Sequence, residues 1–249
     1  MEFKTRAAIF WRSFLMQALW SPATMQNLGL LYALEPALDR LYPKLDERRD
    51  AAMRHLSYFN TNPYMAGFVC GFVARLEETA DEDRIEKLKK AMGAALAAVG
   101  DASVWGSLQP ACAGFAFLAA VAAWSFDFQH AALVCSLMYL LLFNAPTLWM
   151  RWRGIALGYD LGETLPVVMQ EWRWQEKARW VRYGGLACAL AAPLYLIVRE
   201  IGFVGPRAIF PAAGIAAVVL LRRWGFSSLS IYGLCLFAAL GWRGVSSLL

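Results

Sequence analysis

Short apolar segments separated by polar breaks dominate the first half of the chain. The charged stretch 46–59 leads into Asn60-Thr-Asn-Pro63, where Asn62 suits an N-cap and Pro63 a first helical residue. The apolar run that follows, 64–74, is about half the ~20 residues of a membrane-spanning helix. A polar break before a half-length helix is typical of a re-entrant segment, whose free backbone groups need protein or water beside them. We therefore expect this break to border a solute site.

A second interrupted run follows at 91–126, and Asp101 is its single charge. Its polar breaks at 99–101 and 106–110 predict a half-length helix to about Gly100, a polar turn, and a span from about Pro110 to Phe126. A carboxylate at membrane depth is costly unless it is paired or hydrated. A functional role for Asp101 is therefore favoured over the alternative, a structural cap of the following helix.

Four further apolar runs predict spans, which brings the total to about five: 131–150, 183–198, 203–221 and 224–242. Helical spacing of apolar residues predicts an amphipathic helix over 3–18, a second helix over 24–41 and a charged surface helix over 44–54. The predicted fold is an all-α integral membrane protein with N-terminal amphipathic helices, re-entrant half-length helices and about five transmembrane helices. The sequence predicts three regions: 1–63, amphipathic and interfacial helices; 64–130, re-entrant segments and the first span; 131–249, transmembrane helices with a cytoplasmic linker near 151–182.

Composition supports a membrane protein. The chain is 59% hydrophobic and 17% charged, against about 45–50% and about 25% in soluble domains. The net charge of +5 needs no nucleic acid, since basic loops at a membrane surface account for it. Lysine and arginine gather in 151–182 and 222–225, which places these loops in the cytoplasm by the positive-inside rule. In the same region Gly154, Gly158 and Gly162 stand four apart, a spacing that allows close helix contact.

Residues with reactive or metal-binding side chains are scattered. The five cysteines lie far apart in apolar runs without a C-x-x-C pair, and there are only two histidines. This pattern argues against a disulfide framework, a metal site or a cofactor. An intramembrane enzyme built on His55 and Asp101 lacks a nucleophile–base spacing. We expect no catalytic residues.

Ordered motifs along roughly the first 160 residues point to a known family. They are Phe10-Trp-Arg-Ser13, Gln17-Ala-Leu-Trp20, Met25-Gln26, Leu28-Gly29, Pro36-Ala37, Arg40-Leu-Tyr-Pro43, Arg54-His-Leu56, Phe59-Asn-Thr61, Leu76-Glu-Glu78, Val99-Gly-Asp101, Trp105-Gly106 and Gly158-Tyr159. The chain resembles subunit IID of the mannose-family (mannose/fructose/sorbose) sugar phosphotransferase system.

The resemblance implies a partnership and a function. A IID subunit forms a hetero-oligomeric complex with a IIC-like membrane subunit in the bacterial inner membrane, as a multi-pass protein. This complex binds and translocates a hexose-type sugar, while soluble IIA and IIB subunits relay phosphate from phosphoenolpyruvate. Because a IID subunit carries no phosphorylated residue, the resemblance makes His55 a structural or site-lining residue.

This sequence departs from the family pattern at several positions. Where the family has Trp-Asn-x-Glu-Arg-Met-Gln, the chain has Trp20-Ser-Pro-Ala-Thr-Met-Gln26, and family arginines are replaced by Gln109 and Thr147. Ser21, Ala23 and Thr24 thus stand where charged and amide groups would hold sugar hydroxyls. The alternative function is therefore a non-transporting membrane scaffold or regulatory paralogue that recruits phosphotransferase proteins.

The expected substrate site lies where the polar breaks meet. Asn60, Thr61 and Asp101 supply polar groups at helix ends, and Trp20 or Trp105 supplies a flat face for a sugar. The matched motifs add three more residues. The candidate substrate-binding set is Gln17, Trp20, Gln26, His55, Asn60, Thr61, Asp101 and Trp105.

Overall fold

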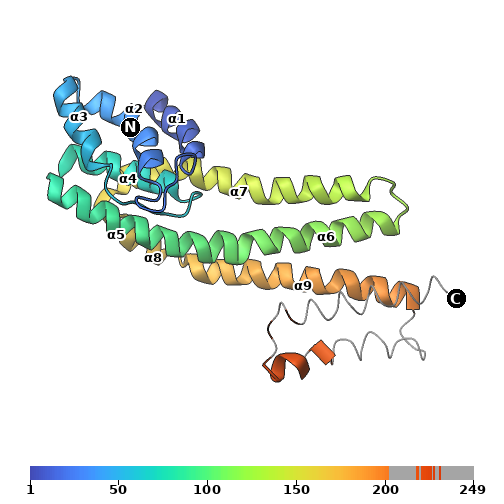
Figure 1. Ribbon diagram of the computed structural model, residues 1–249. Coiled ribbons are helices and arrows are strands. Elements are labelled where there is room, and N and C mark those ends of the chain that lie inside the picture. Colours follow the sequence, from blue (N-terminus) through green and yellow to red (C-terminus); the bar gives the residue numbers. More distant parts are fainter. Residues whose placement is uncertain (202–216, 219, 226, 228–229, 231–249) are drawn as a thin grey trace. The chain divides into compact units, whose positions relative to one another are not determined.

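The computed structural model describes residues 1–201, 217–218, 220–225, 227 and 230, and its regular elements are helices (Figure 1). In order they are α1 (Phe3–Arg12), η1 (Ser13–Leu15), α2 (Asn27–Leu41), α3 (Leu45–Arg54), α4 (Ala66–Thr79), α5 (Glu82–Gly100), the π-helix η2 (Asp101–Leu108), α6 (Gln109–Ser125), α7 (Ala131–Leu161), η3 (Gly162–Thr164), α8 (Leu165–Glu171) and α9 (Trp174–Ile201). Residues Met1–Leu190 form one compact unit. The predicted spans 203–221 and 224–242 fall largely outside the described residues.

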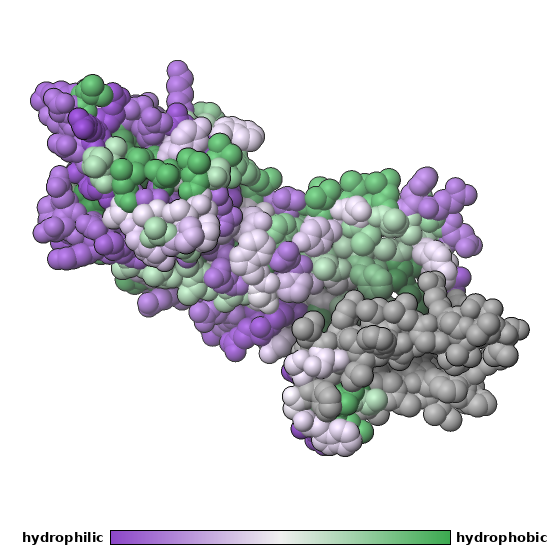
Figure 2. Space-filling view, in the orientation of Figure 1, coloured by the Kyte–Doolittle hydropathy of each residue, from purple (hydrophilic) through white to green (hydrophobic). Residues whose placement is uncertain are grey.

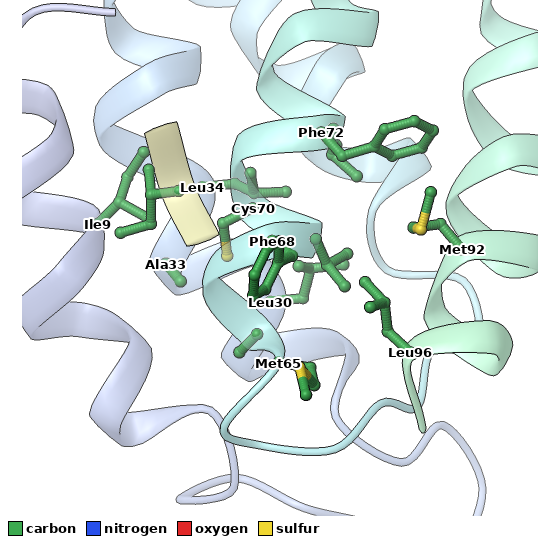
Figure 3. Packing of buried hydrophobic residues seen from close by; sticks show 14 of the residues in the cluster. Ile9, Leu30, Ala33, Leu34, Met65, Phe68, Cys70, Phe72, Met92 and Leu96 are labelled. Carbon is green, nitrogen blue, oxygen red and sulfur yellow. The ribbon is translucent and has the colours of Figure 1, made fainter. Parts of the chain in front are cut away.

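Helix α4 forms the centre of the core. Every residue from Ala66 to Ala74 is buried, so the helix has no solvent-facing side along most of its length. Figure 3 shows α4 side chains such as Phe68 between Ile9 and Leu34 on one side and Met92 on the other. A helix that is apolar on all faces is stable only when other elements surround it. Helices α1, α2, α5 and α7 do so here.

Glycines bring α4 and α7 into backbone contact. Gly67 and Gly71 face backbone carbonyl groups of α7, while Gly154 and Gly158 face Phe68 of α4. A methyl group at any of these four positions would collide with the facing atoms. The glycine spacing in the sequence thus correctly predicts close helix contact at Gly154 and Gly158. Gly162 has a different role: it ends α7, where its φ of +48° lies in the left-handed region.

One uninterrupted helix runs from Glu82 to Ser125, which makes the predicted polar turn near Gly100 wrong. The helix absorbs the two expected breaks by widening into the π-helix η2, where Ser107 Oγ donates to the Ala102 carbonyl at 2.9 Å. Pro110 follows this stretch and has no N–H to give to the helix. A π-helical stretch changes the hydrogen-bond register beside such a residue without ending the helix.

Within the described part of the chain, two long helical segments are apolar enough to cross a membrane, Glu82–Ser125 and Ala131–Glu171. Helices α6 and α7 form a hairpin that extends from the α1–α5 region (Figure 1). Much of this hairpin is covered by apolar side chains, whereas polar residues gather over α2, α3 and the start of α5 (Figure 2). The chain is an all-α membrane protein, as predicted. At 14 residues α4 is too short to span, which is compatible with the predicted re-entrant segment.

Several predicted boundaries shift. The first helix ends at Arg12 rather than Ala18, because Ser13 bonds back to the Phe10 carbonyl and a 3₁₀ turn follows. The second begins at Asn27 rather than Thr24. Helix α4 begins at Ala66, so Pro63 is not its first residue. The region 151–182 is mostly helical, and the predicted span 183–198 lies within α9.

The α4–α7 contact leads to a test by glycine replacement. We expect Gly71→Ala to lower the thermal unfolding temperature of the purified protein, because its methyl group would meet α7 backbone that cannot rotate away. Overpacking of this kind costs about 1–3 kcal/mol. Gly184→Ala is the matched control, since its methyl group meets only Phe115 Cζ at 3.4 Å. Equal unfolding temperatures for the two variants would contradict the packing role of Gly71.

Candidate functional site

Asn62 connects the two polar breaks. The residue is buried, and its side-chain amide donates to Asp101 Oδ1 at 2.8 Å. Its own carbonyl oxygen accepts from the backbone N–H of Tyr64 at 3.0 Å, which closes the turn before α4. The polar loop therefore contacts the start of η2 through Asn62 rather than Asn60, although the second segment is continuous helix and not a break. Asp101 accepts this bond from its exposed position at the start of η2, so it does not act as the cap of a following helix.

Gln26 holds the loop before Asn62 in place. Its backbone N–H donates to the Phe59 carbonyl at 2.8 Å, and its side-chain Oε1 accepts from the Thr61 N–H at 3.1 Å. Gln26 and Thr61 are both buried. The Thr61 hydroxyl has no hydrogen-bond partner in the described part of the chain. A buried hydroxyl without a partner is unfavourable, so this group is available to a ligand or a water molecule.

Aromatic rings border the same loop. Trp105 lies edge-to-face with Tyr64, with ring centroids 5.2 Å apart, and Tyr64 packs on Phe143 at 5.5 Å. Trp105 is 41% exposed and therefore keeps surface for another molecule. This ring can supply the flat apolar face that a sugar needs beside the polar groups of the loop.

Arg151 is a buried cation that the sequence interpretation counted only as a loop charge. Its guanidinium donates to the Ser13 carbonyl at 2.7 Å and to Ser13 Oγ at 3.1 Å, and it lies over the ring of Phe14. It also lies 5.8 Å from the ring of Tyr64, on the aromatic border of the site. Among the described residues it has no carboxylate partner. Its position directly after an apolar run was the available signal.

Four candidate residues remain: Gln17, Trp20, Asn60 and His55. They lie away from the contact between Asn62 and Asp101 or make few contacts near it. Gln17 and Trp20 are exposed in the segment between η1 and α2. The backbone N–H of Trp20 donates to the Gln17 carbonyl. Asn60 is half-buried, with its carbonyl against Gly93 of α5. His55 belongs to a separate cluster at the other end of α4.

That cluster is a buried charge network around Glu77 of α4. Arg54 donates to both carboxylate oxygens at 3.1 Å, and the Tyr42 hydroxyl donates to Oε2 at 2.8 Å. His55 Nε2 lies 3.0 Å from Oε1, but the pair is poorly aligned for a hydrogen bond, so the contact is mainly electrostatic. Lys89 of α5 completes the network by donating to the Arg54 carbonyl at 2.8 Å. Helices α3, α4 and α5 are thus joined by buried charges.

Comparison with known proteins identifies the family. The model described as "PTS system mannose/fructose/sorbose family IID component" matches residues 1–181. The chain belongs to this IID family. The mannose-specific EIID component of Escherichia coli (strain K12) is 37% identical over 161 residues, which is 62% of this chain and 54% of that protein. The sorbose-specific EIID component of Klebsiella pneumoniae is 34% identical over 62% of this chain and 56% of its own length.

Solved structures agree with the IID assignment. One described as "Structure of membrane protein" covers 97% of both chains with a TM-score of 0.70 and 25% identity. A cryo-EM structure of the mannose transporter ManYZ in complex with microcin E492 contains a chain with a TM-score of 0.56 and 25% identity. That match covers 99% of this chain and 97% of the other. This IID-family chain spans about half the length of the curated relatives it matches.

Two residues at the predicted departures from the family pattern, Ser21 and Thr24, bond to each other. Ser21 Oγ lies 2.9 Å from Thr24 Oγ1 and accepts from the Thr24 N–H at 3.2 Å. Thr147 is buried and donates to the Phe143 carbonyl of its own helix at 2.9 Å. These hydroxyls therefore satisfy local backbone and side-chain groups.

Acidification weakens the Glu77 network of this IID-family chain. Burial by itself raises the pKa of Glu77, but the contact with His55 and the bonds from Tyr42 and Arg54 outweigh it, so the pKa lies below its ordinary value. Burial lowers the pKa of His55 despite the opposing effect of Glu77. Below pH 6.5, the ordinary pKa of histidine, the unfolded chain therefore binds more protons at this position than the folded chain. The contribution of His55 to the free energy of unfolding is present above that pH and is lost as the pH falls. The contribution of Glu77 is lost in the same direction, below its ordinary pKa of 4.5.

The thermal unfolding temperature of the purified protein should therefore fall between pH 7.5 and pH 5, with the midpoint of the change below pH 6.5. His55→Gln should flatten this dependence, because it removes the group whose pKa is lower in the folded chain than in the unfolded chain. His130→Gln is the matched control, since His130 is exposed and is the other of the two histidines. An unchanged pH dependence in His55→Gln would exclude this account.

Proposed function

We propose that the chain is the IID-type membrane subunit of a phosphoenolpyruvate-dependent sugar phosphotransferase system. With a IIC-type subunit it would bind and translocate a hexose-type sugar across the bacterial inner membrane, while soluble IIA and IIB subunits carry the phosphoryl group. Membership of the IID family supports this function. The names of its relatives, which include mannose-specific and sorbose-specific components, support the substrate class. The ManYZ likeness supports a hetero-oligomer.

One observation carries the proposal for the site: the hydrogen bond between Asn62 and Asp101 that joins the polar loop to η2. This bond uses one carboxylate oxygen of Asp101 and leaves the other for a ligand. The buried hydroxyl of Thr61, on the same loop as Asn62, has no partner among the described residues. Trp105, on the same π-helix as Asp101, offers a partly exposed ring. Carboxylate, hydroxyl and aromatic face are the groups that bind a hydroxyl-rich ring.

A second candidate is the non-transporting scaffold or regulatory paralogue. The turn at Ser21–Thr24 favours it, because the two hydroxyls bond to each other where the family has charged and amide side chains. A chain that has lost sugar-binding groups there can keep its fold and its membrane partner. Recruitment of phosphotransferase proteins without sugar uptake would distinguish this function.

Uptake measurements test the site. The chain would be expressed with a IIC-type subunit and matching IIA and IIB proteins in cells without their own mannose-family system, and uptake of labelled mannose, fructose and sorbose measured. Asp101→Asn should reduce uptake of the transported sugar roughly thirtyfold, because a charge-assisted hydrogen bond is worth about 2 kcal/mol. Asparagine still offers an acceptor to Asn62, so co-purification with the IIC-type subunit should persist.

Asp127→Asn is the matched control for the charge change. Asp127 is exposed, and its φ of +55° suits asparagine as well as aspartate. Unchanged uptake in Asp101→Asn would remove Asp101 from the site, and loss of co-purification would give it a structural role instead. Absence of uptake of every sugar by the wild-type complex, together with retained binding of phosphotransferase proteins, would establish the scaffold function.

A further inference from the structure

A hollow lies beside η2 and is lined by Ser103, Val104 and Leu108 of that helix. Its volume is about 540 Å³, within the ~300–1,000 Å³ range of small-molecule sites. Helix η2 forms one wall, the middle of α7 a second, and the α8–α9 junction a third. The polar, charged and tryptophan side chains of its lining include Ser103, Trp149, Arg153, Trp172, Trp174 and Lys177. We name this hollow the tryptophan groove.

Two cations on the tryptophan groove lack a carboxylate. Arg153 and Lys177 are exposed, and neither forms an ion pair within the described part of the chain. Nearby basic residues differ, since Arg173 pairs with Glu176 at 2.6 Å and Arg84 pairs with Glu163. The groove therefore has a positive edge beside apolar and aromatic walls, and an anionic amphiphile matches that combination.

Two polar atoms of the lining also lack partners. Ser103 is 7% exposed, and its hydroxyl makes no hydrogen bond among the described residues. Its neighbour on the π-helix, Ser107, donates normally to the Ala102 carbonyl. The indole N–H of Trp174 is likewise buried without a partner. Buried donors of this kind are normally satisfied, so they point to an acceptor supplied by a bound molecule.

We propose that the tryptophan groove binds one anionic phospholipid. The phosphate lies against Arg153 and Lys177, the ester carbonyls accept from the Ser103 hydroxyl and the Trp174 indole, and an acyl chain occupies the apolar walls. The groove is built on the two described segments that are long and apolar enough to cross a membrane. Tryptophan and unpaired cations are typical of the level of the headgroups.

A hexose fits the tryptophan groove less well. The hydroxyls of a hexose need many polar partners, whereas the walls of the groove are mostly apolar. A hexose is also neutral, so it would not pair with the two cations. A helix of a partner subunit would leave both cations and the Ser103 hydroxyl without partners unless it brought an anion. Phospholipid binding goes beyond the proposed transport function and is measured without sugar, so either proposal can fail independently.

Native mass spectrometry tests lipid binding directly. The full chain, purified from membranes in mild detergent with its co-expressed partner subunit, would be titrated with phosphatidylglycerol and with phosphatidylcholine of the same acyl chains. We expect tighter binding of phosphatidylglycerol. Arg153→Gln with Lys177→Gln should weaken that binding roughly tenfold, to the level of phosphatidylcholine. Ala178→Trp should weaken both lipids, because it fills the groove and leaves the cations in place.

Arg49→Gln with Lys87→Gln is the matched control. It removes two exposed cations that lie away from the groove and should leave the lipid preference unchanged. Equal losses in the two double variants would overturn the proposal, as would unchanged binding in Ala178→Trp. An Ala178→Cys variant carrying a thiol-reactive crosslinker gives the last arm. Capture of phosphatidylglycerol supports the lipid, and capture of the partner subunit instead would overturn it.

Discussion

The close contact between α4 and α7 is the constraint on which the rest of the structure depends. Helix α4 is apolar on every face and too short to span a membrane, so it is stable only inside a protein shell. Gly67 and Gly71 on one helix and Gly154 and Gly158 on the other remove the side chains that would separate them. Lipid tails are as apolar as leucine, so such packing, rather than exclusion of water, holds helices together in a membrane.

Polar systems lie at both ends of α4, although Glu78 and Thr79 at its second end are exposed. At the first end Asn62 closes the turn before α4 and bonds to Asp101. At the other, Glu77 gathers Arg54 and His55 from the end of α3 and the loop after it. Charges buried in this way are stable only when each finds a partner, which is why they form a network rather than isolated groups. The two systems bind neighbouring segments to α4, and only the first leaves polar groups for a ligand.

Sequence patterns predicted those features of the structure that depend on the length of a segment or the spacing of residues within it. The half-length helix and the glycine contact follow from segment length and spacing, and the structure confirms them. Whether Asn62 or Asn60 contacts Asp101 depends on the direction of the loop, and the Glu77 network depends on how α3 and α5 approach α4. A local sequence pattern predicts neither. The polar turn near Gly100 was wrong because a helix can absorb polar residues and a proline by a change of register. The span count, the orientation and the region boundaries remain predictions.

The π-helix η2 explains how one helix can serve two sites. Asp101 and Trp105 belong to the region of the polar loop, whereas Ser103 and Val104 line the tryptophan groove. Because a π-helix has more residues in each turn than an α-helix, its insertion rotates the side chains on either side relative to each other. The helix α5, which carries Lys89 of the charge network, and the membrane helix α6 can then each keep their own packing face. A movement of η2 between π and α registers would change Asp101 and Ser103 together. This one stretch of backbone is therefore the physical link between the loop and the groove.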